Sequence, residues 1–206
     1  MDTKFPLNKL LKGKLLKIAE LQDKLIVELL SKFDVVLHGG TAIWRVYGGK
    51  RFSYDLDLYF SKPKEILEHF KKSDFTMLKG KVTGSDVVYM KFSDGVAEVE
   101  VEVSPMFRKV SPVDGEFFMV GGDSLIIGTL SARDLIQEKI DAFKGRKKAR
   151  DLYDIFFLLD KADIHLKGLK PIKVPRDFAG LKEIILMGKC PDFETIKRKV
   201  YMYAKG

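Results

Sequence analysis

Leucine and isoleucine residues recur every three or four positions through the first part of the chain, with lysines between them. This spacing extends over residues 7–32 and predicts one long amphipathic helix. The apolar runs that follow are shorter, and Gly, Pro or Ser residues bound them. They predict a strand at 33–38, a helix at 41–47, a strand at 54–60 and a helix at 61–72.

The period then changes from helical to alternating. Valines at 99, 101 and 103 alternate with Glu98, Glu100 and Glu102, which predicts a strand with one apolar and one acidic face. Just before it, Ser93-Asp94-Gly95 has the residues of a tight hairpin turn. Strands are predicted at 75–79, 86–92, 96–103, 117–120 and 125–127, the last two as short edge strands.

From residue 131 the pattern is helical again. Ser131 has the character of an N-cap, and helices are predicted at 131–143, 147–160, 176–187 and 192–203. The order of elements indicates an α+β fold, in which helices flank a mixed sheet. We expect a core over residues 1–129, with its N-terminal helix, and a helical C-terminal lobe over residues 130–206.

Composition limits the classes of protein that need consideration. The chain has no apolar run of the roughly 20 residues that a membrane span requires, and its first residues lack a secretory signal, so we expect a cytoplasmic protein with no membrane partner. The single cysteine, Cys190, excludes an internal disulfide or a cysteine-based zinc site. The three histidines, at positions 38, 69 and 165, are scattered along the chain.

The positive charge is concentrated in the last third of the chain. Residues 1–129 contain 19 Lys and Arg against 18 Asp and Glu, whereas residues 130–206 contain 18 against 11. Such an asymmetry suits a polyanionic partner such as RNA. A lysine-rich solvated surface would give the same numbers, and the sequence does not choose between the two.

Residues 39–57 contain the strongest chemical signal. Gly39, Gly40 and Thr41 can present backbone N–H groups to a phosphate at a helix N-terminus, where Thr41 could also be a plain N-cap. Asp55 and Asp57 are two residues apart, so on a strand both carboxylates project from one face. Oxygen ligands beside a phosphate cradle are what a Mg²⁺-dependent phosphoryl or nucleotidyl transfer site requires.

A two-metal site needs a third carboxylate near these two. Glu98, Glu100 and Glu102 lie on one strand face, and at least two of them are expected to be surface residues. Arg51, together with Arg45 and Lys50, lies between the glycines and the aspartates, where it either contacts a triphosphate or frames the loop. His38 is expected to be a packed core residue rather than a base.

The helical lobe adds a second group of charged residues. Asp151 and Asp154 fall on a largely apolar helix and should have partners, for which Lys139 and Arg150 are the natural candidates. Lys139 could instead reach a triphosphate as a point charge. Five cations within residues 144–150 would attract an RNA backbone, although a solvated loop between helices explains them equally well.

Four blocks of this sequence belong together when they are taken in order. They are His-Gly-Gly-Thr-Ala-Ile (38–43), Arg-Phe-Ser-Tyr-Asp-Leu-Asp-Leu (51–58), Glu-Lys-Ile-Asp-Ala (138–142) and Ala-Arg-Asp-Leu-Tyr-Asp-Ile (149–155). In this order they resemble the AbiEii-type nucleotidyltransferases, toxins of abortive-infection and toxin–antitoxin systems within the DNA polymerase β-like superfamily. The resemblance implies a polymerase β-like nucleotidyltransferase core, Mg²⁺ or Mn²⁺, an NTP donor, and an antitoxin partner. Related toxins act on tRNA 3′ ends.

The resemblance also implies roles for individual residues. By this likeness, Gly40 and Thr41 match the nucleotide motif, Asp55 and Asp57 the metal-binding pair, and Ser53 the serine before that pair. Lys139 matches the family's lysine and Asp151 the acid of its Arg-Asp block. The third carboxylate fits Glu102 best and Glu100 second.

The sequence therefore predicts a Mg²⁺-dependent nucleotidyltransferase that moves an NMP from an NTP to an acceptor hydroxyl on RNA. Two alternatives stay open. The acceptor could be a protein or small-molecule hydroxyl, or the chain could be a non-catalytic module that binds nucleotide or a partner. A DNA-binding role is least favoured, because the sequence contains no recognisable recognition helix or zinc module.

Overall fold

The centre of the molecule is a seven-stranded mixed sheet with the strand order β3-β4-β5-β2-β1-β7-β6. The computed structural model describes residues 6–106, 111–164 and 172–204. The strands are β1 (Val36–His38), β2 (Leu56–Phe60), β3 (Met77–Val82), β4 (Val88–Ser93), β5 (Glu98–Pro105), β6 (Val113–Phe118) and β7 (Ser124–Thr129). The α-helices are α1 (Leu7–Leu10), α2 (Gly13–Lys32), α3 (Gly39–Arg45), α4 (Pro63–Phe70), α5 (Ala132–Arg146), α6 (Ala149–Leu158) and α7 (Phe193–Met202).

The strand pairing confirms the predicted α+β class. Strand β2 pairs antiparallel with β1 and parallel with β5. Strand β1 also pairs parallel with β7, so the middle of the sheet is mixed. The β3–β4, β4–β5 and β6–β7 pairs are antiparallel.

The sequence pattern predicted one continuous N-terminal helix, but the helix is interrupted. It divides into α1 and α2, because Leu11 and Lys12 adopt extended backbone angles. This break turns the side chain of Leu11 inward, where it is 1% exposed. Burial of one leucine contributes roughly 1.5–3 kcal/mol, which offsets the lost helical hydrogen bonds.

The predicted strands are present in the structure, but some of their first and last residues differ from the prediction. The turn at residues 93–95 joins β4 to β5, but Val96 belongs to this turn and is 68% exposed, so the strand begins at Glu98. The segment at 125–127 was predicted as an edge strand, whereas β7 lies between β1 and β6, and β6 alone of these two is at the edge. Strands β6 and β7 stabilise each other along six residue pairs, which explains their greater length.

The C-terminal helices differ from the prediction in length: α5 extends three residues beyond the predicted end at 143, whereas α6 and α7 are shorter than predicted. The hydroxyl of Ser131 accepts a hydrogen bond from the Asp134 N–H and caps α5, as expected. The helix predicted at 176–187 is instead a 3-10 helix, Phe178–Ile184 (η2). It is followed by an isolated bridge between Ile185 and Arg51, which connects the lobe to the loop before β2.

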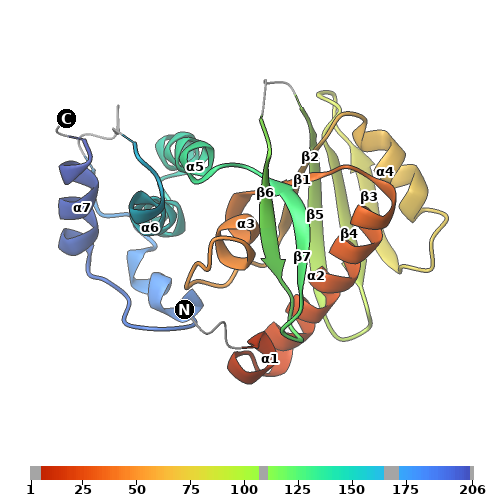
Figure 1. The fold of residues 1–206 in the computed structure, drawn as a ribbon, viewed down its shortest axis with the longest axis horizontal. Coiled ribbons are helices and arrows are strands. Elements are labelled where there is room, and N and C mark those ends of the chain that lie inside the picture. Colours follow the sequence, from red (N-terminus) through yellow and green to blue (C-terminus); the bar gives the residue numbers. More distant parts are fainter. Residues whose placement is uncertain (1–5, 107–110, 165–171, 205–206) are drawn as a thin grey trace.

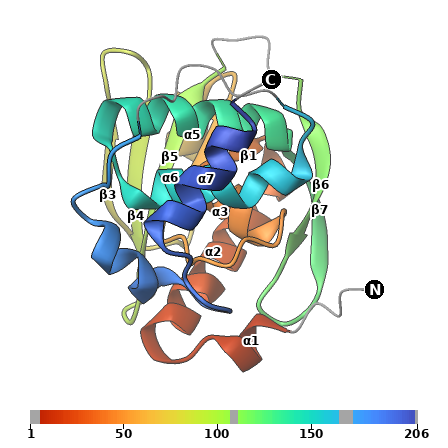
Figure 2. The same cartoon turned by 90° about the vertical axis from the view of Figure 1, so that its left-hand side faces the viewer.

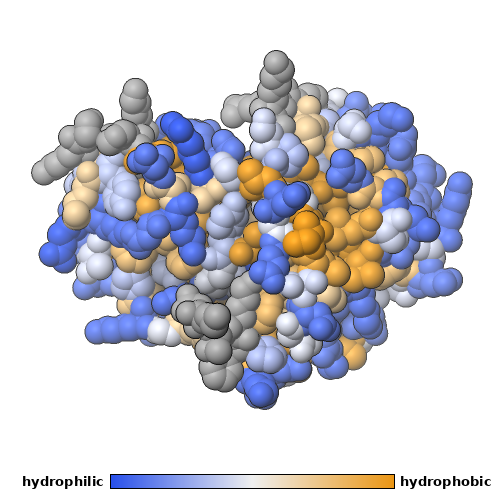
Figure 3. Space-filling view, viewed as in Figure 1, coloured by the Kyte–Doolittle hydropathy of each residue, from blue (hydrophilic) through white to orange (hydrophobic). Residues whose placement is uncertain are grey.

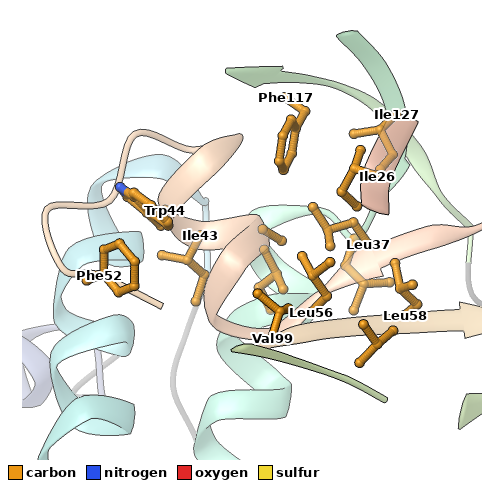
Figure 4. Packing of buried hydrophobic residues seen from close by; sticks show 14 of the residues in the cluster. Ile26, Leu37, Ile43, Trp44, Phe52, Leu56, Leu58, Val99, Phe117 and Ile127 are labelled. Carbon is orange, nitrogen blue, oxygen red and sulfur yellow. The ribbon is translucent and has the colours of Figure 1, made fainter. Parts of the chain in front are cut away.

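Alternation along β2 decides which of its side chains can reach solvent. Leu56 and Leu58 are fully buried and lie near Val99 of β5 in the core (Figure 4). Because successive strand residues point to opposite faces, Asp57 projects from the other face of the sheet. The hydrophobic packing beneath β2 therefore sets the direction of the acidic side chain.

The helices form two groups around the sheet. In Figure 1, α2 and α4 lie over one side of the sheet, whereas α5, α6 and α7 form a lobe at the opposite end of the molecule. Figure 2 shows this lobe in front of the sheet. Buried side chains from the sheet and from the lobe belong to one continuous hydrophobic cluster.

The face shown in Figure 3 has an apolar area over the region where Figure 1 places α2 and β7. Val27 of α2 is 46% exposed and Ile126 of β7 is 68% exposed. Across the described part of the chain, no helix has the length and apolar character needed to cross a membrane.

Candidate active site

The acidic residues of β2 and β5 meet across the sheet. Asp57 and Glu102 are direct partners in the parallel β2–β5 pairing. Adjacent strands are about 4.8 Å apart, and partners in register project from the same face. Both carboxylates line a pocket of 350 Å³ that Asp55 and Glu100 also line. The structure thus brings together the aspartate pair and the third acid that the sequence predicted.

Gly39 is placed directly against Asp57. Its φ of +68° is unfavourable for side chains other than glycine. A Cβ atom at this position would collide with the Asp57 carboxylate. Since His38 pairs with Asp57 between β1 and β2, the start of α3 is held beside the acidic strand. The first glycine of the motif is needed for this close approach.

The small residues that follow form the first turn of α3. A Cβ atom on Gly40 would collide with the hydroxyl of Ser53, so these two residues are also in close contact. Thr41 is not an N-cap, because the helix begins two residues earlier with His38 as its cap. Its buried hydroxyl donates a 2.5 Å hydrogen bond to the backbone carbonyl of Asp55. Thr41 therefore fixes the loop that carries the first aspartate, and its side chain is not open to a phosphate.

Asp55 lies in an electrostatically unfavourable position. Burial raises the pKa of its carboxyl, and the neighbouring carboxylates of Asp57 and Glu100 raise it further. Arg150 and Arg51 oppose this effect. Crowded carboxylates of this kind are relieved by a bound cation.

The donor set fits a hard divalent ion, because it consists of carboxylate oxygens. Within residues 6–106, 111–164 and 172–204, no three His, Cys, Asp or Glu side chains are close enough to form a complete metal site. Mg²⁺ often binds to only one or two carboxylates and completes its shell with water and substrate phosphates. Binding by all of Asp55, Asp57 and Glu102 would therefore require their side chains to move closer together around the ion.

Glu102 differs from the other two glutamates of β5. It is half-buried, and its Oε1 accepts a hydrogen bond of 3.2 Å from the Ser104 hydroxyl. Tyr89 of β4 also hydrogen-bonds to Glu102, and burial together with this carboxylate raises the pKa of Tyr89. Glu98 and Glu100 are exposed, as expected for at least two of the three. Glu98 forms a 2.7 Å ion pair with Lys91.

A buried ion pair holds the loop before β2. The Arg51 guanidinium donates two hydrogen bonds of 2.6 Å to the carboxylate of Asp154 on α6. Lys139 of α5 approaches the same carboxylate at 3.1 Å. Burial alone would raise the pKa of Asp154, but Arg51 and Lys139 hold it below its ordinary value. Arg51 is 4% exposed and its guanidinium is paired with Asp154, so in this arrangement it frames the loop.

Of the two partners that the sequence suggested for Asp151, Lys139 forms an ion pair with it, but Arg146 is closer. Arg146 donates hydrogen bonds of 2.7 and 2.6 Å to its carboxylate, and Lys139 lies 3.8 Å away. Arg150 pairs with neither buried aspartate and instead faces Asp55. Asp151 is fully buried, which makes it a positioning residue for Arg146.

Sequence reasoning did not single out Arg146, although it lies within the basic run at 144–150. Its side chain is 44% exposed, and the Asp151 hydrogen bonds and the nearby Asp57 raise its pKa. Arg146, Lys139 and Gly39 line a second pocket of 580 Å³ between the sheet and α5. Lys139 is 6% exposed, so Arg146 is the more accessible cation in this pocket.

His38 was expected to be a packed core residue. Its side chain is largely buried, at 13% exposed, but it also forms part of the wall of the same pocket. Its ring stacks on Tyr59 with centroids 3.9 Å apart, and its Nδ1 lies 3.2 Å from Glu138 Oε2. The Tyr59 hydroxyl donates to the other oxygen of Glu138 at 2.7 Å. Burial alone would raise the pKa of Glu138, but these contacts lower it. Only the tertiary structure reveals this group.

A mixed sheet that carries acids on two neighbouring strands, beside a Gly-Gly helix start and a cationic helical lobe, fits the nucleotidyltransferase class. The chain belongs to the AbiEii family, because residues 26–176 match the family model described as nucleotidyl transferase AbiEii toxin of type IV toxin–antitoxin systems. No curated protein matches the chain significantly.

Solved structures with this fold include three similar proteins. A putative nucleotidyltransferase from Helicobacter pylori has 24% identity and a TM-score of 0.65, with 95% of each chain covered. JHP933 from the same species has 22% identity and a TM-score of 0.61, with 95% of this chain and 92% of that chain covered. MenT4, a nucleotidyltransferase toxin from Mycobacterium tuberculosis, has 17% identity and a TM-score of 0.62, with 93% of this chain and 83% of that one covered.

Proposed function

We propose that this toxin-family nucleotidyltransferase moves an NMP from an NTP to a hydroxyl of RNA, with Mg²⁺ or Mn²⁺ held by Asp55, Asp57 and Glu102. The observation that carries the proposal is the pairing of Asp57 with Glu102 in one pocket, beside Asp55. When bound, the metal would neutralise phosphate charge and polarise the reacting oxygens.

The residues of the chain supply the remaining functions. Backbone N–H groups of Gly40 and Thr41, in the first turn of α3, are available to hold the donor phosphates. Arg146, fixed by Asp151, would neutralise triphosphate charge from the pocket that Gly39 also lines. Lys139 adds positive charge beneath it.

In the reaction, the oxygen of the acceptor hydroxyl forms a bond to the α-phosphorus. The bond from this phosphorus to the oxygen leading to the β-phosphorus breaks, and pyrophosphate leaves. Glu102 accepts the proton of the attacking hydroxyl. The cation-lined pocket would thus hold the donor, and the acidic pocket would receive the acceptor. An antitoxin is the expected protein partner of a toxin from this family.

The direct test incubates the purified chain with each α-labelled NTP, Mg²⁺ and total RNA. We expect label on RNA, and a loss of more than about a hundredfold in Asp57→Asn. Asp74→Asn, at an exposed position after α4, is the matched control and should transfer normally. The proposal is wrong if the wild-type protein transfers nothing, or if Asp57→Asn transfers equally well. Label on protein that survives RNase treatment would identify a different acceptor.

A further inference from the structure

Two lysines of β3 lie beside the acidic pocket and have no assigned role. Lys79 and Lys81 are two residues apart, are both exposed, and line the 350 Å³ pocket together with Asp57 and Glu102. They belong to the edge strand of the sheet. We call Lys79 and Lys81 the β3 strip.

The strand register connects this strip to the acids. Lys81 is the partner of Tyr89, and Tyr89 is the partner of Glu102, which in turn pairs with Asp57. One row across four strands therefore runs from a cation through an aromatic ring to two carboxylates. With strands about 4.8 Å apart, the cation lies roughly 14 Å from the second carboxylate along the backbone.

The charges of the strip are not used within the described structure. Neither Lys79 nor Lys81 forms an ion pair with a residue in the described ranges, whereas the nearby Lys91 pairs with Glu98. The Lys81 ammonium lies over the Tyr89 ring, 4.9 Å from its centroid. Two accessible cations that point toward a pocket of carboxylates can bind an anion that has to approach those carboxylates.

A simpler explanation is that lysines protect an edge strand from aggregation. This role would be served by lysines pointing in any outward direction. Here both charges lie on the face that the pocket occupies, whereas Leu78 and Val82 on the alternate positions are 53% and 39% exposed. The two lysines thus do not shield the exposed apolar residues of the edge strand from aggregation. Both lysines instead lie at the acidic pocket.

The two pockets have no lining residue in common, and both border the acids. Gly39, which abuts Asp57, lines the larger pocket, and so does Ser104, which donates a hydrogen bond to Glu102. The β3 strip lines the smaller pocket. If the donor triphosphate occupies the larger pocket beside Arg146, the second substrate must approach from the smaller one.

We propose that the β3 strip binds the phosphodiester backbone of the acceptor RNA strand and directs its acceptor hydroxyl to Asp57 and Glu102. This inference rests on the proposed function. Each phosphate neutralised by a lysine releases counterions, so the contact should be visible in the salt dependence of binding.

The experiment measures binding of a 5′-fluorescein-labelled single-stranded RNA by anisotropy, in Mg²⁺ without NTP, over a range of salt concentrations. For Lys79→Gln/Lys81→Gln we expect binding weakened about tenfold, and a slope of log K against log[salt] reduced by about 1.4 for two lost contacts. The control, Lys24→Gln/Lys72→Gln, removes the same charge from exposed positions on α2 and just after α4, and should stay within about twofold.

Equal affinity and equal slope in the two double variants would overturn the proposal, as would absence of binding by the wild-type protein. Asp57→Asn should still bind RNA. If the wild-type protein binds RNA through the β3 strip but transfers no nucleotide, the proposed function is wrong, whereas RNA binding by the strip is supported. Urea unfolding of each variant establishes that the fold is intact.

A second measurement locates the strand directly. An RNA with 4-thiouridine near its 3′ end should crosslink under ultraviolet light to peptides within residues 77–91. Crosslinks confined to the basic run at 144–150 would place the acceptor on the helical lobe and contradict the proposal.

Discussion

Gly39 and Asp57 are in such close contact that a single added carbon on the glycine would occupy the position of the carboxylate. The contact joins the first turn of α3 to β2, and it sets the position of one metal-binding candidate. Gly48, which follows the C-terminal end of α3, has a similar φ of +72° but has no atom within 4 Å of an added Cβ. Substitutions at the two glycines therefore distinguish backbone strain, which both positions share, from steric clash, which occurs at Gly39 and not at Gly48.

We expect Gly39→Ala to lose more than about a hundredfold in kcat, because the displaced Asp57 can no longer hold its ligand geometry. Gly48→Ala carries the same backbone cost, about 1–2 kcal/mol, and should keep its activity. Steady-state kinetics and urea unfolding of both variants make the comparison. A similar kcat for the two would show that the contact is not required for catalysis.

The three glutamates of β5 should differ sharply in their importance. Replacing Glu102 with Gln should lower kcat by about 10²–10⁴-fold, because Glu102 pairs with Asp57 and is held by Ser104. Glu98→Gln should have almost no effect, because Glu98 is exposed and paired with Lys91. Glu100→Gln should fall between them, through its electrostatic effect on Asp55. A larger loss for Glu100 than for Glu102 would reassign the third carboxylate.

Breaking the buried pair of Arg51 and Asp154 should destabilise the fold. Asp154→Asn leaves Arg51 without its counter-charge and Lys139 with only the more distant Asp151, and we expect a loss of about 3–5 kcal/mol in the free energy of unfolding at pH 7. Glu65→Gln, which breaks an exposed pair with Lys62, should cost less than about 1 kcal/mol. Chemical unfolding measures both.

The cost of Asp154→Asn should depend on pH in a defined direction. Because the pKa of Asp154 in the folded state is below its ordinary value of 3.8, the folded protein binds this proton less readily than the unfolded chain. Its contribution is complete above about pH 4 to 5 and is lost as the pH falls through the folded-state pKa. The difference in the free energy of unfolding between the wild-type protein and Asp154→Asn should therefore become smaller in acid. A difference that becomes larger there would contradict a lowered pKa for Asp154.

Removing the charge of Asp55 should stabilise the protein without metal. Its carboxylate is partly buried and close to Asp57 and Glu100, so Asp55→Asn should raise the Tm in EDTA by about 2–4 °C, while nucleotidyl transfer is lost. Mg²⁺ should raise the Tm of the wild-type protein by mass action and have a smaller effect on the variant. Calorimetry with and without Mg²⁺ tests this, with Asp74→Asn as the control. An equal rise in Tm on addition of Mg²⁺ for all three proteins would show that the metal binds elsewhere.

Much of the site was predictable, because its residues are short-range features of the sequence. Gly39 and Gly40 mark a turn, Asp55 and Asp57 are two residues apart where β2 begins, and Glu102 belongs to an alternating run. The sequence period determines which side chains share a face. The order of apolar segments likewise predicted the α+β class, and the hairpin at 93–95 followed from its turn residues.

The tertiary structure decided which segments meet. No local pattern shows that Asp57 pairs with Glu102 across 45 residues, or that Arg51 pairs with Asp154 on a distant helix. Thr41 was misassigned as a possible cap, since its partner, the Asp55 carbonyl, lies 14 residues away. The sequence could not distinguish Arg146 from the other cations of the basic run, because only packing shows which of them is fixed by a buried aspartate.

The sequence by itself thus determined the chemical identity of the acids, their shared faces and the small residues beside them, since these depend on backbone periodicity and residue type. Strand order, register and the docking of α5 and α6 depend on burial of apolar surface between distant segments. Those non-local contacts decided which carboxylates share a pocket, which cations are buried, and that the lysines of β3 border the acids.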